Sequence, residues 1–205
     1  MGVLEIDDDR MHTPSGDKGW RESFYFNFVD LKSGISGFTT IGLMPALKKR
    51  EFVFAIFHGD RQTLHFAEPK GPFESSGTEP LSDGTVTYEE LEPMKKWRLR
   101  LSKRDAAADL IWESRFPPFQ FGGCSGTSWS GHFEQSGIVT GTVELGGAHL
   151  KVEGLGHRDK SWGPRDWHID SWFALHAQFR NSAIGLRRDF TGTSFSLSGG
   201  VLSAE

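Results

Sequence analysis

The residues best suited to chemistry lie within one short segment, residues 154–172. Two Arg-Asp pairs, Arg158-Asp159 and Arg165-Asp166, follow one another within it. Tryptophan is rarely so concentrated in a surface loop, so we interpret the segment as a loop that is either a structural plug or a functional site. Its chemically versatile residues are aspartates, arginines, histidines and tryptophans: Asp159, Asp166, Asp170, Arg158, Arg165, His157, His168, Trp162, Trp167 and Trp172.

Two interpretations of this segment stay open. In the first, it is a lid in which Arg-Asp pairs form bidentate hydrogen bonds and the tryptophan rings cover one end of the fold. In the second, one aspartate points into a cavity, where burial raises the pKa of its carboxyl group and allows it to act as a general acid. An adjacent arginine lowers the pKa of an aspartate. Only an aspartate turned away from its arginine would therefore keep a proton near neutral pH.

Weaker candidates lie elsewhere in the chain. His132 and Glu134 would share one face of a strand and could act as a base and its orienting group, or form a cross-strand surface pair. His168 and Asp170 have the same spacing, but no third ligand stands out, so we predict no metal site and no cofactor. Cys124 lies in a Gly/Ser-rich stretch with no base beside it, and we interpret it as an inert thiol.

The elements that must position these residues have the period of β-strands. Phe24, Phe26 and Phe28 fall on one face of a segment with period two, and this stripe is either plain core or one wall of a ligand cavity. Gly146-Gly147 between two strand-like runs is the best hairpin signal. No amphipathic helix stands out. We expect about ten strands, drawn from twelve extended segments: 22–30, 35–44, 51–57, 62–67, 85–91, 97–101, 107–116, 137–145, 148–154, 171–179, 183–189 and 195–204.

Composition limits the class of protein. The chain has 205 residues, a formal net charge of −4 and 37% hydrophobic residues, which is typical of a globular protein without a nucleic-acid-binding charge pattern. Its apolar runs are too short for a transmembrane helix. A single cysteine excludes an internal disulfide, and we expect a reducing, cytoplasmic setting. Glycine (25 residues) and phenylalanine (17 residues) are abundant, as expected for short strands and tight turns around a cavity.

These patterns predict an all-β protein, an antiparallel barrel or sandwich whose sequential hairpins favour an up-and-down meander like that of lipocalins. No shift in composition divides the chain. We therefore expect residues 1–205 to form a single domain.

Two stretches resemble a known superfamily. Residues 156–167 read Gly-His-Arg-Asp-Lys-Ser-Trp-Gly-Pro-Arg-Asp-Trp, which resembles the signature of the hydroxyneurosporene-synthase and AttH-like proteins. Residues 132–137, His-Phe-Glu-Gln-Ser-Gly, resemble an uncharacterised bacterial branch of the same superfamily. The resemblance implies a lipocalin-like β-barrel. Fuller members carry two such domains in tandem, and we expect this chain to lack the second one.

The resemblance also implies an activity, because the superfamily includes hydratases that add water to alkenes of carotenoid or prenylated substrates, and pericyclic catalysts. On that basis we expect an acid-assisted hydratase or isomerase for an isoprenoid-like or polycyclic molecule. Asp159 or Asp166 would donate the proton, and His157 or His168 would position water. The ligand-binding set would consist of aromatic rings, whose faces stabilise positive charge, and two arginines: Trp162, Trp167, Trp172, Phe24, Phe26, Arg158 and Arg165.

Two other classes of function remain open. A non-catalytic carrier of a lipophilic ligand needs only an aromatic lining and an open mouth. A structural domain would fill its barrel with its own side chains. In each case we expect a hydrophobic small molecule or no ligand, without nucleic acid or a membrane span. The sequence gives no oligomeric state.

Overall fold

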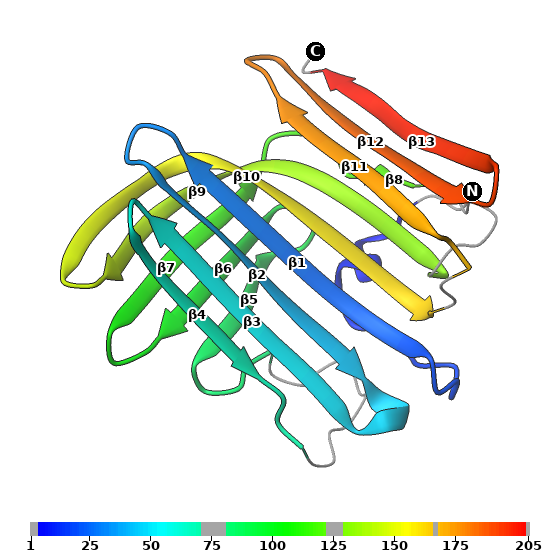
Figure 1. Ribbon diagram of the computed structural model, residues 1–205, viewed down its shortest axis with the longest axis horizontal. Helices are drawn as coiled ribbons and strands as arrows, with labels where there is room; N and C mark the ends of the chain where they lie inside the picture. Colours follow the sequence, from blue (N-terminus) through cyan, green and yellow to red (C-terminus); the bar gives the residue numbers. More distant parts are fainter. Residues whose placement is uncertain (1–3, 71–80, 122–128, 166–167, 204–205) are drawn as a thin grey trace.

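The fold is built almost entirely from antiparallel strands (Figure 1). The computed structural model describes residues 4–70, 81–121, 129–165 and 168–203. In these ranges the chain forms thirteen strands and two short 3-10 helices, η1 (Ile6–Asp9) and η2 (Pro45–Leu47). The predicted all-β, lipocalin-like fold class is confirmed. None of the described helices is long and apolar enough to cross a membrane.

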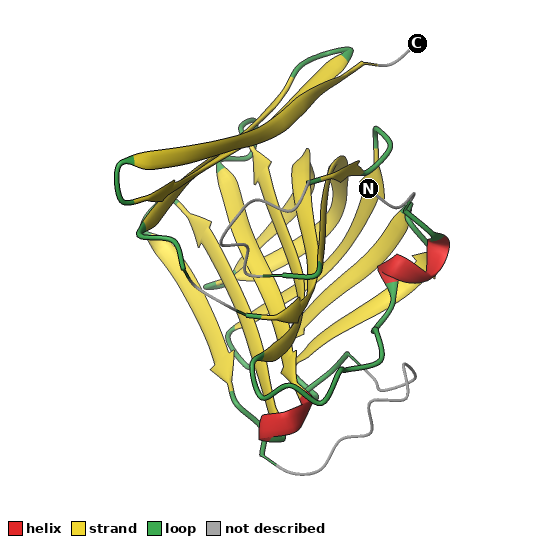
Figure 2. Cartoon of the chain, turned by 90° about the vertical axis from the view of Figure 1, so that its right-hand side faces the viewer, coloured by secondary structure: helices red, strands yellow, loops and turns green. Residues whose placement is uncertain are grey.

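The larger sheet has ten strands and curls around an interior (Figure 2). Its order is β4-β3-β2-β1-β10-β9-β7-β6-β5, with β8 paired to β9. Two meanders are therefore joined where β1 pairs with β10. The strands are β1 (Trp20–Asp30), β2 (Ile35–Met44), β3 (Lys49–His58), β4 (Arg61–Ala67), β5 (Val86–Glu92), β6 (Lys96–Ser102), β7 (Ala106–Ser114), β8 (Phe119–Gln120), β9 (Gly131–Leu145) and β10 (Ala148–Pro164).

The interpretation of residues 154–172 as a loop is wrong for its first half. Residues 154–164 continue β10, which pairs with β1 on one side and β9 on the other. Side chains alternate between the two faces of a strand. Arg158 and Lys160 therefore point to the core face, and His157 and Asp159 point to the opposite face. The predicted pairing of Arg158 with its neighbour Asp159 is also wrong for this reason.

The interior of the curled sheet is packed with aromatic rings. Phe26 contacts the rings of Tyr88, Trp97 and Trp112 at centroid distances of 5.3–5.8 Å, and Phe24 packs beside them. All five of these side chains are buried. Phe24 and Phe26 thus belong to the core, which is one of the two alternatives, rather than to a wall of the cavities that the described residues line.

Two cations are buried in this aromatic interior, and each has a carboxylate partner. The guanidinium of Arg158 donates to Asp9 of η1 at 2.6 Å and 3.3 Å, and lies over the rings of Trp112 and Phe133 at 5.1 Å and 5.0 Å. Lys160 forms an ion pair with Glu22 on the neighbouring strand. A cation without a partner would be costly at such depth, so the N-terminal turn is tied to β10.

The same carboxylate of Asp9 also connects η1 to the other half of the sheet. It accepts hydrogen bonds from the backbone N–H of Met94, at 2.6 Å, and from Nε1 of Trp97, at 3.3 Å. Oε1 of Gln135 accepts a further hydrogen bond from Nε of Arg158, at 2.9 Å. Helix η1 therefore closes one part of the interior through a shared polar network.

A second sheet of three strands, β11 (Ser171–Gln178), β12 (Ser182–Thr191) and β13 (Ser194–Ser203), lies across one end of the larger sheet (Figure 2). Nε2 of Gln178 donates to the backbone oxygen of Gly156 on β10 at 2.6 Å. Gly200 meets Phe119 so closely that an added Cβ would lie 2.6 Å from the ring. This small sheet covers the face of β9 and β10 that points away from the core.

Removing the negative charge of Asp9 should destabilise the whole fold. We expect Asp9→Asn to lower the free energy of unfolding by about 3–5 kcal/mol, because it leaves Arg158 buried without a counter-charge. Asp109→Asn is the matched control, since it breaks the partly exposed Arg98–Asp109 pair and should barely change the urea concentration at the midpoint of unfolding. Urea denaturation followed by tryptophan fluorescence measures both. Equal midpoints for the two variants would contradict the assigned role of Asp9.

Candidate functional site

A group of histidines and carboxylates gathers between the two sheets, on the face of β9 and β10 opposite the core. We call it the His–Glu cluster: His132 and Glu134 from β9, His157 and Asp159 from β10, and His176 from β11. Strand register brings the first four together, because Asp159 pairs with Glu134 across the two strands. His176 joins them only because the small sheet packs over this face.

One half of the cluster is an ion pair centred on His132. Its Nε2 lies 3.0 Å from Oδ2 of Asp159 and 3.4 Å from Oε1 of Glu134, and its ring stacks on Phe121 with centroids 4.9 Å apart. Burial opposes protonation of this imidazole, but the two carboxylates outweigh it and raise its pKa to about 9. His132 is therefore an imidazolium near neutral pH.

The proton-donor role expected of Asp159 loses its physical basis here. Burial raises the pKa of its carboxyl group, yet the charge and hydrogen bond of His132 lower it further, and the net pKa lies below the ordinary value. Asp159 is turned away from Arg158, as the second interpretation required. Its carboxylate is ionised nonetheless, because the imidazolium of His132 lies beside it in place of the guanidinium of Arg158.

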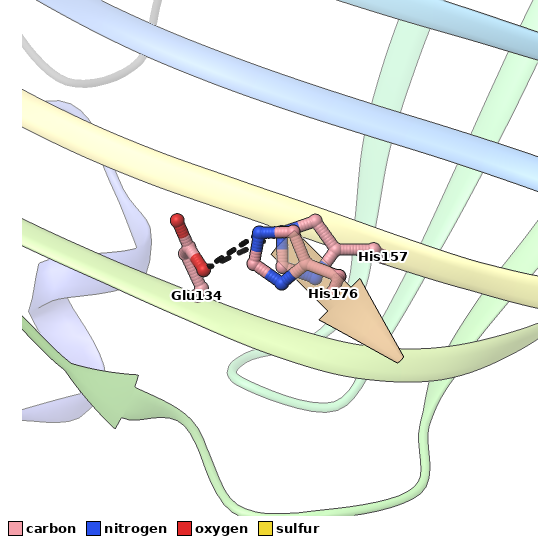
Figure 3. Close-up of side chains that lie close together, drawn as sticks. All are labelled: Glu134, His157 and His176. Carbon is pink, nitrogen blue, oxygen red and sulfur yellow. Dashed lines mark ion pairs between the residues drawn. The ribbon is translucent and has the colours of Figure 1, made fainter. Parts of the chain in front are cut away.

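The other half of the cluster faces a cavity. Oε2 of Glu134 lies 3.0 Å from Nε2 of His176 and 3.8 Å from Nε2 of His157. Figure 3 shows both rings with nitrogen atoms toward this carboxylate. The rings stack with centroids 3.5 Å apart and an interplanar angle of 29°. Burial, followed by the neighbouring His176, lowers the pKa of His157 to about 3, so this imidazole is neutral.

The cavity next to these histidines has a volume of about 400 Å³. Its wall is mostly apolar, and the rings of Tyr25, Phe38 and Phe57 follow one another at centroid distances of 6.4 Å. Phe57 is 39% exposed, so the cavity opens to solvent at that end. The end next to β10 carries four polar side chains, those of Asn27, His157, His176 and Gln178, and Ser36 and the hydroxyl of Tyr25 are the other polar side-chain groups of the lining.

The structure disperses the other residues that the sequence singled out. Asp166 and Trp167 lie outside the described residues. His168 lies away from the cluster, where its backbone oxygen accepts from Thr191 at 3.3 Å. Arg165 donates to the backbone oxygen of Arg21 at 3.2 Å, and burial followed by the charge of Arg21 lowers its pKa to about 10.

Two of the expected ligand-binding tryptophans also lie apart from the cavity. Trp162 stacks on His12 at 3.9 Å. Trp172 is 55% exposed on the small sheet, with Arg187 5.6 Å from its ring. Arg158 is held in the core by Asp9. Of the residues proposed for the site, His157 and Asp159 are the ones that the structure brings into the cluster.

The sequence gave only weak evidence for two other residues of the site, His132 and Glu134, and none for His176 and Gln178. The His132-Glu134 spacing predicted a shared strand face, and the pair does share one, but it is buried rather than on the surface. His176 and Gln178 gave no signal, because they stand alone in a strand with no neighbouring polar partner. Their position follows only from the packing of the second sheet.

Comparisons with known proteins support the fold. A family described as a domain of unknown function (DUF7064) matches residues 5–203. The structure of an AttH protein from Nitrosomonas europaea is similar, with a TM-score of 0.70, 15% identity, and coverage of 98% of this chain and 69% of that chain. Kievitone hydratase from Nectria haematococca gives a TM-score of 0.63, 10% identity, and coverage of 97% and 64%. The structure of CghA with Sch210972 gives a TM-score of 0.61 and 11% identity, and the match covers 91% of this chain and 58% of that chain.

The lipocalin-like fold that the resemblance implied is thus confirmed. This chain spans less than two thirds of the length of kievitone hydratase and of CghA. No curated protein matches the sequence. Sequence identities this low establish shared architecture and carry no activity with them.

The ion pairs of the cluster should make stability depend on pH. The pKa of His132 rises from 6.5 to about 9 on folding, so its stabilising contribution is complete below pH 6.5 and is lost as the pH rises through 9. We expect the free energy of unfolding to fall by about 3 kcal/mol over this range. His132→Asn should remove most of that slope in urea denaturation at a series of pH values.

His157 should have the opposite effect on the acidic side. Its pKa falls from 6.5 to about 3 on folding, so its contribution is complete above pH 6.5 and is lost as the pH falls toward 3. The same urea denaturation series measures it as a fall in the free energy of unfolding below pH 6.5.

The alkaline range tests His132 alone. A free energy of unfolding of the wild type that is constant from pH 6.5 to 9 would contradict the geometry of the His132 ion pair.

Proposed function

The chain belongs to the family described as a domain of unknown function (DUF7064), and from the geometry of its site we propose that it is an enzyme that hydrates or isomerises a hydrophobic small molecule. One observation carries the proposal. The His–Glu cluster meets the polar end of an apolar cavity between the two sheets. We propose a single lipocalin-like domain over residues 1–205, and the cytoplasmic location stays a prediction.

The cavity has the features of a small-molecule site. Such sites are concave, mainly apolar, and carry a few convergent polar groups. A volume of about 400 Å³ suits a ligand of two or three fused rings or a short isoprenoid chain. The rings of Tyr25 and Phe38 would contact its apolar body, while Asn27 and Gln178 would hydrogen-bond an oxygen at its polar end.

The cluster offers a group for proton transfer at that end. Imidazole is the side chain most often used as a general acid or base. His176 lines the cavity with a quarter of its side chain exposed, and its Nε2 is 3.0 Å from the carboxylate of Glu134. Glu134 is itself within 3.4 Å of His132, which Asp159 holds at 3.0 Å. A line of contacts between ionisable groups therefore leads from the cavity to the ion pair of His132 and Asp159, whose imidazole is buried and whose carboxylate is partly exposed.

This arrangement suits both proposed reactions. In hydration, one carbon of a double bond gains a proton and the other gains the hydroxyl of a water molecule, whose second proton returns to the protein. In isomerisation, a proton leaves one carbon and a proton is returned to another. Each reaction leaves the proton count of the cluster unchanged. His176 would transfer the proton, and Glu134 would position its ring.

Fold relatives support this class of reaction without identifying a substrate. One similar structure is a kievitone hydratase, and another was determined with the small molecule Sch210972. Both are longer proteins. Their ligands therefore do not define the ligand proposed for this chain.

A carrier of lipophilic molecules is the second candidate. The apolar wall favours it, with Val29, Phe57 and Leu155 partly exposed around the cavity. A carrier needs this wall but has no use for a proton-transfer group. The two candidates therefore differ in their dependence on the cluster.

Blocking the cavity should abolish binding of a hydrophobic probe. We expect Ser36→Trp to lower the affinity for the neutral fluorophore phenylnaphthylamine at least 10-fold, because Ser36 lines the cavity on β2. Thr40→Trp is the matched control, since residues 36 and 40 share one face of the strand and Thr40 does not line this cavity. Fluorescence titration measures both. Equal affinities would show that the probe binds elsewhere.

Removing the proton-transfer group should abolish turnover without abolishing binding. We expect Glu134→Gln and His176→Asn to slow water addition about 100-fold or more, while the fluorophore still binds. Wild-type protein would be screened with isoprenoid and polycyclic alkenes in heavy-oxygen water, with mass spectrometry to detect the added oxygen or a shifted double bond. Tight binding of the alkenes with no reaction by the wild type would favour the carrier.

A further inference from the structure

We infer that Glu134, His157 and His176 form a binding site for a divalent transition-metal ion, with Zn²⁺ as the representative case. Two imidazoles and one carboxylate are a common ligand set for catalytic zinc. The three side chains come from β9, β10 and β11. Each contributes one donor atom, and these atoms lie within 4.8 Å of one another.

The separations of the carboxylate oxygen from the two imidazole nitrogens suit one small cation, and the two stacked rings, with centroids 3.5 Å apart, would spread on binding so that both nitrogens point to the ion. Zinc ligands lie about 2.0–2.2 Å from the ion in a tetrahedral arrangement, which separates neighbouring donors by roughly 3.4 Å. Oε2 of Glu134 is 3.0 Å from Nε2 of His176 and 3.8 Å from Nε2 of His157, so the two distances bracket that value. Figure 3 shows both imidazoles facing the same carboxylate oxygen.

The hydrogen bonding of these atoms is incomplete. Oε2 of Glu134 and Nδ1 of His157 are buried and have no hydrogen-bond partner among the described residues. Both residues are more than nine-tenths buried. Buried polar atoms without partners are rare and call for an explanation, such as a bound ion or water. A cation between the three donors would satisfy Oε2 of Glu134, whereas the nitrogen of His157 that faces this oxygen is Nε2 and not the unpartnered Nδ1.

The surroundings favour Glu134, His157 and His176 as the ligands over a second group of potential ligands that overlaps with them at Glu134. His132, Glu134 and Asp159 also lie within metal-binding distance of one another, but His132 already forms a hydrogen bond with Asp159 at 3.0 Å. That imidazole approaches the other oxygen of Glu134, Oε1, at 3.4 Å. It would orient the carboxylate as outer-shell partners of metal ligands do, and it leaves Oε2 free for the ion.

An ion at this position would lie next to the cavity, because two of its three ligands, His157 and His176, line the cavity, although Glu134 does not. Three protein ligands leave one position of a tetrahedral zinc ion for water or a ligand oxygen. Such an ion would polarise a bound oxygen as a Lewis acid. With Nε2 of His176 bound to it, the ion would take over the role that this imidazole has in the proposed proton transfer. This consequence rests on the proposed function, whereas binding of the ion rests only on the three donors.

Isothermal titration of the full chain with ZnCl₂, after removal of metal with a chelator, tests the inference. We expect one Zn²⁺ per chain, at least a 10-fold loss of affinity in Glu134→Gln and in His176→Ala, and no saturable binding of Mg²⁺, which prefers oxygen ligands. Binding of Co²⁺ should produce the visible absorption of a tetrahedral complex. His149→Ala is the control, because it removes an exposed imidazole that also lies 3.2 Å from a glutamate.

The outcomes separate this inference from the proposed function. Absence of Zn²⁺ binding, or binding that survives in both Glu134→Gln and His176→Ala, would overturn the metal site. Circular dichroism checks that these variants remain folded. Phenylnaphthylamine binding, measured on the same samples, reports on the cavity independently. If the wild type fails to bind Zn²⁺ but binds phenylnaphthylamine, and Ser36→Trp no longer binds the fluorophore, the metal site is disproved and the proposed ligand cavity is supported.

Discussion

The structure depends on the alternation of side chains along β10, the strand that is paired on both sides. Because successive residues point to opposite faces, the charged segment is divided into two sets that never meet. Arg158 and Lys160 enter an aromatic interior, where each requires a carboxylate. His157 and Asp159 reach the other face and meet the side chains of β9. One geometric rule thus creates both the core network and the site.

The core network explains why the N-terminal turn belongs to the fold. Asp9 is fully buried, and it reaches Arg158 and Trp97 from a helix of only four residues. So short a helix has little intrinsic stability. Its position therefore follows from the charge that it neutralises. The interior is closed by this turn and by rings, so the candidate ligand cavity lies outside it, between the two sheets.

The small sheet turns a patch of polar side chains into a site. Without it, Glu134 and His157 would face solvent and need no partners. With it, His176 completes a buried group whose carboxylate faces two imidazoles, and the cavity acquires a polar end. The candidate site therefore lies between the two sheets rather than within the aromatic interior of the larger one.

The class of fold could be predicted from the strand patterns of the amino-acid sequence. Period-two alternation in segments such as Phe24 to Phe28 fixes strands and their buried faces, because the pleat imposes that period. The sequence also located the chemically rich segment, and it placed His132 and Glu134 on one face. The prediction of a loop for residues 154–164 was wrong. A central strand can bury charged side chains only where partners of opposite charge lie next to them, and the partners here, Asp9 and Glu22, are far away in the sequence.

Tertiary structure alone decided which residues act together. Glu134, His157 and His176 come from three strands, and no spacing along the chain relates them. It also reversed the role of Asp159, whose protonation depends on the distance to His132 rather than on the adjacent arginine. Strand patterns are local properties of the chain. Electrostatic environment and ligand convergence depend on contacts between distant segments, and only the packed fold supplies these.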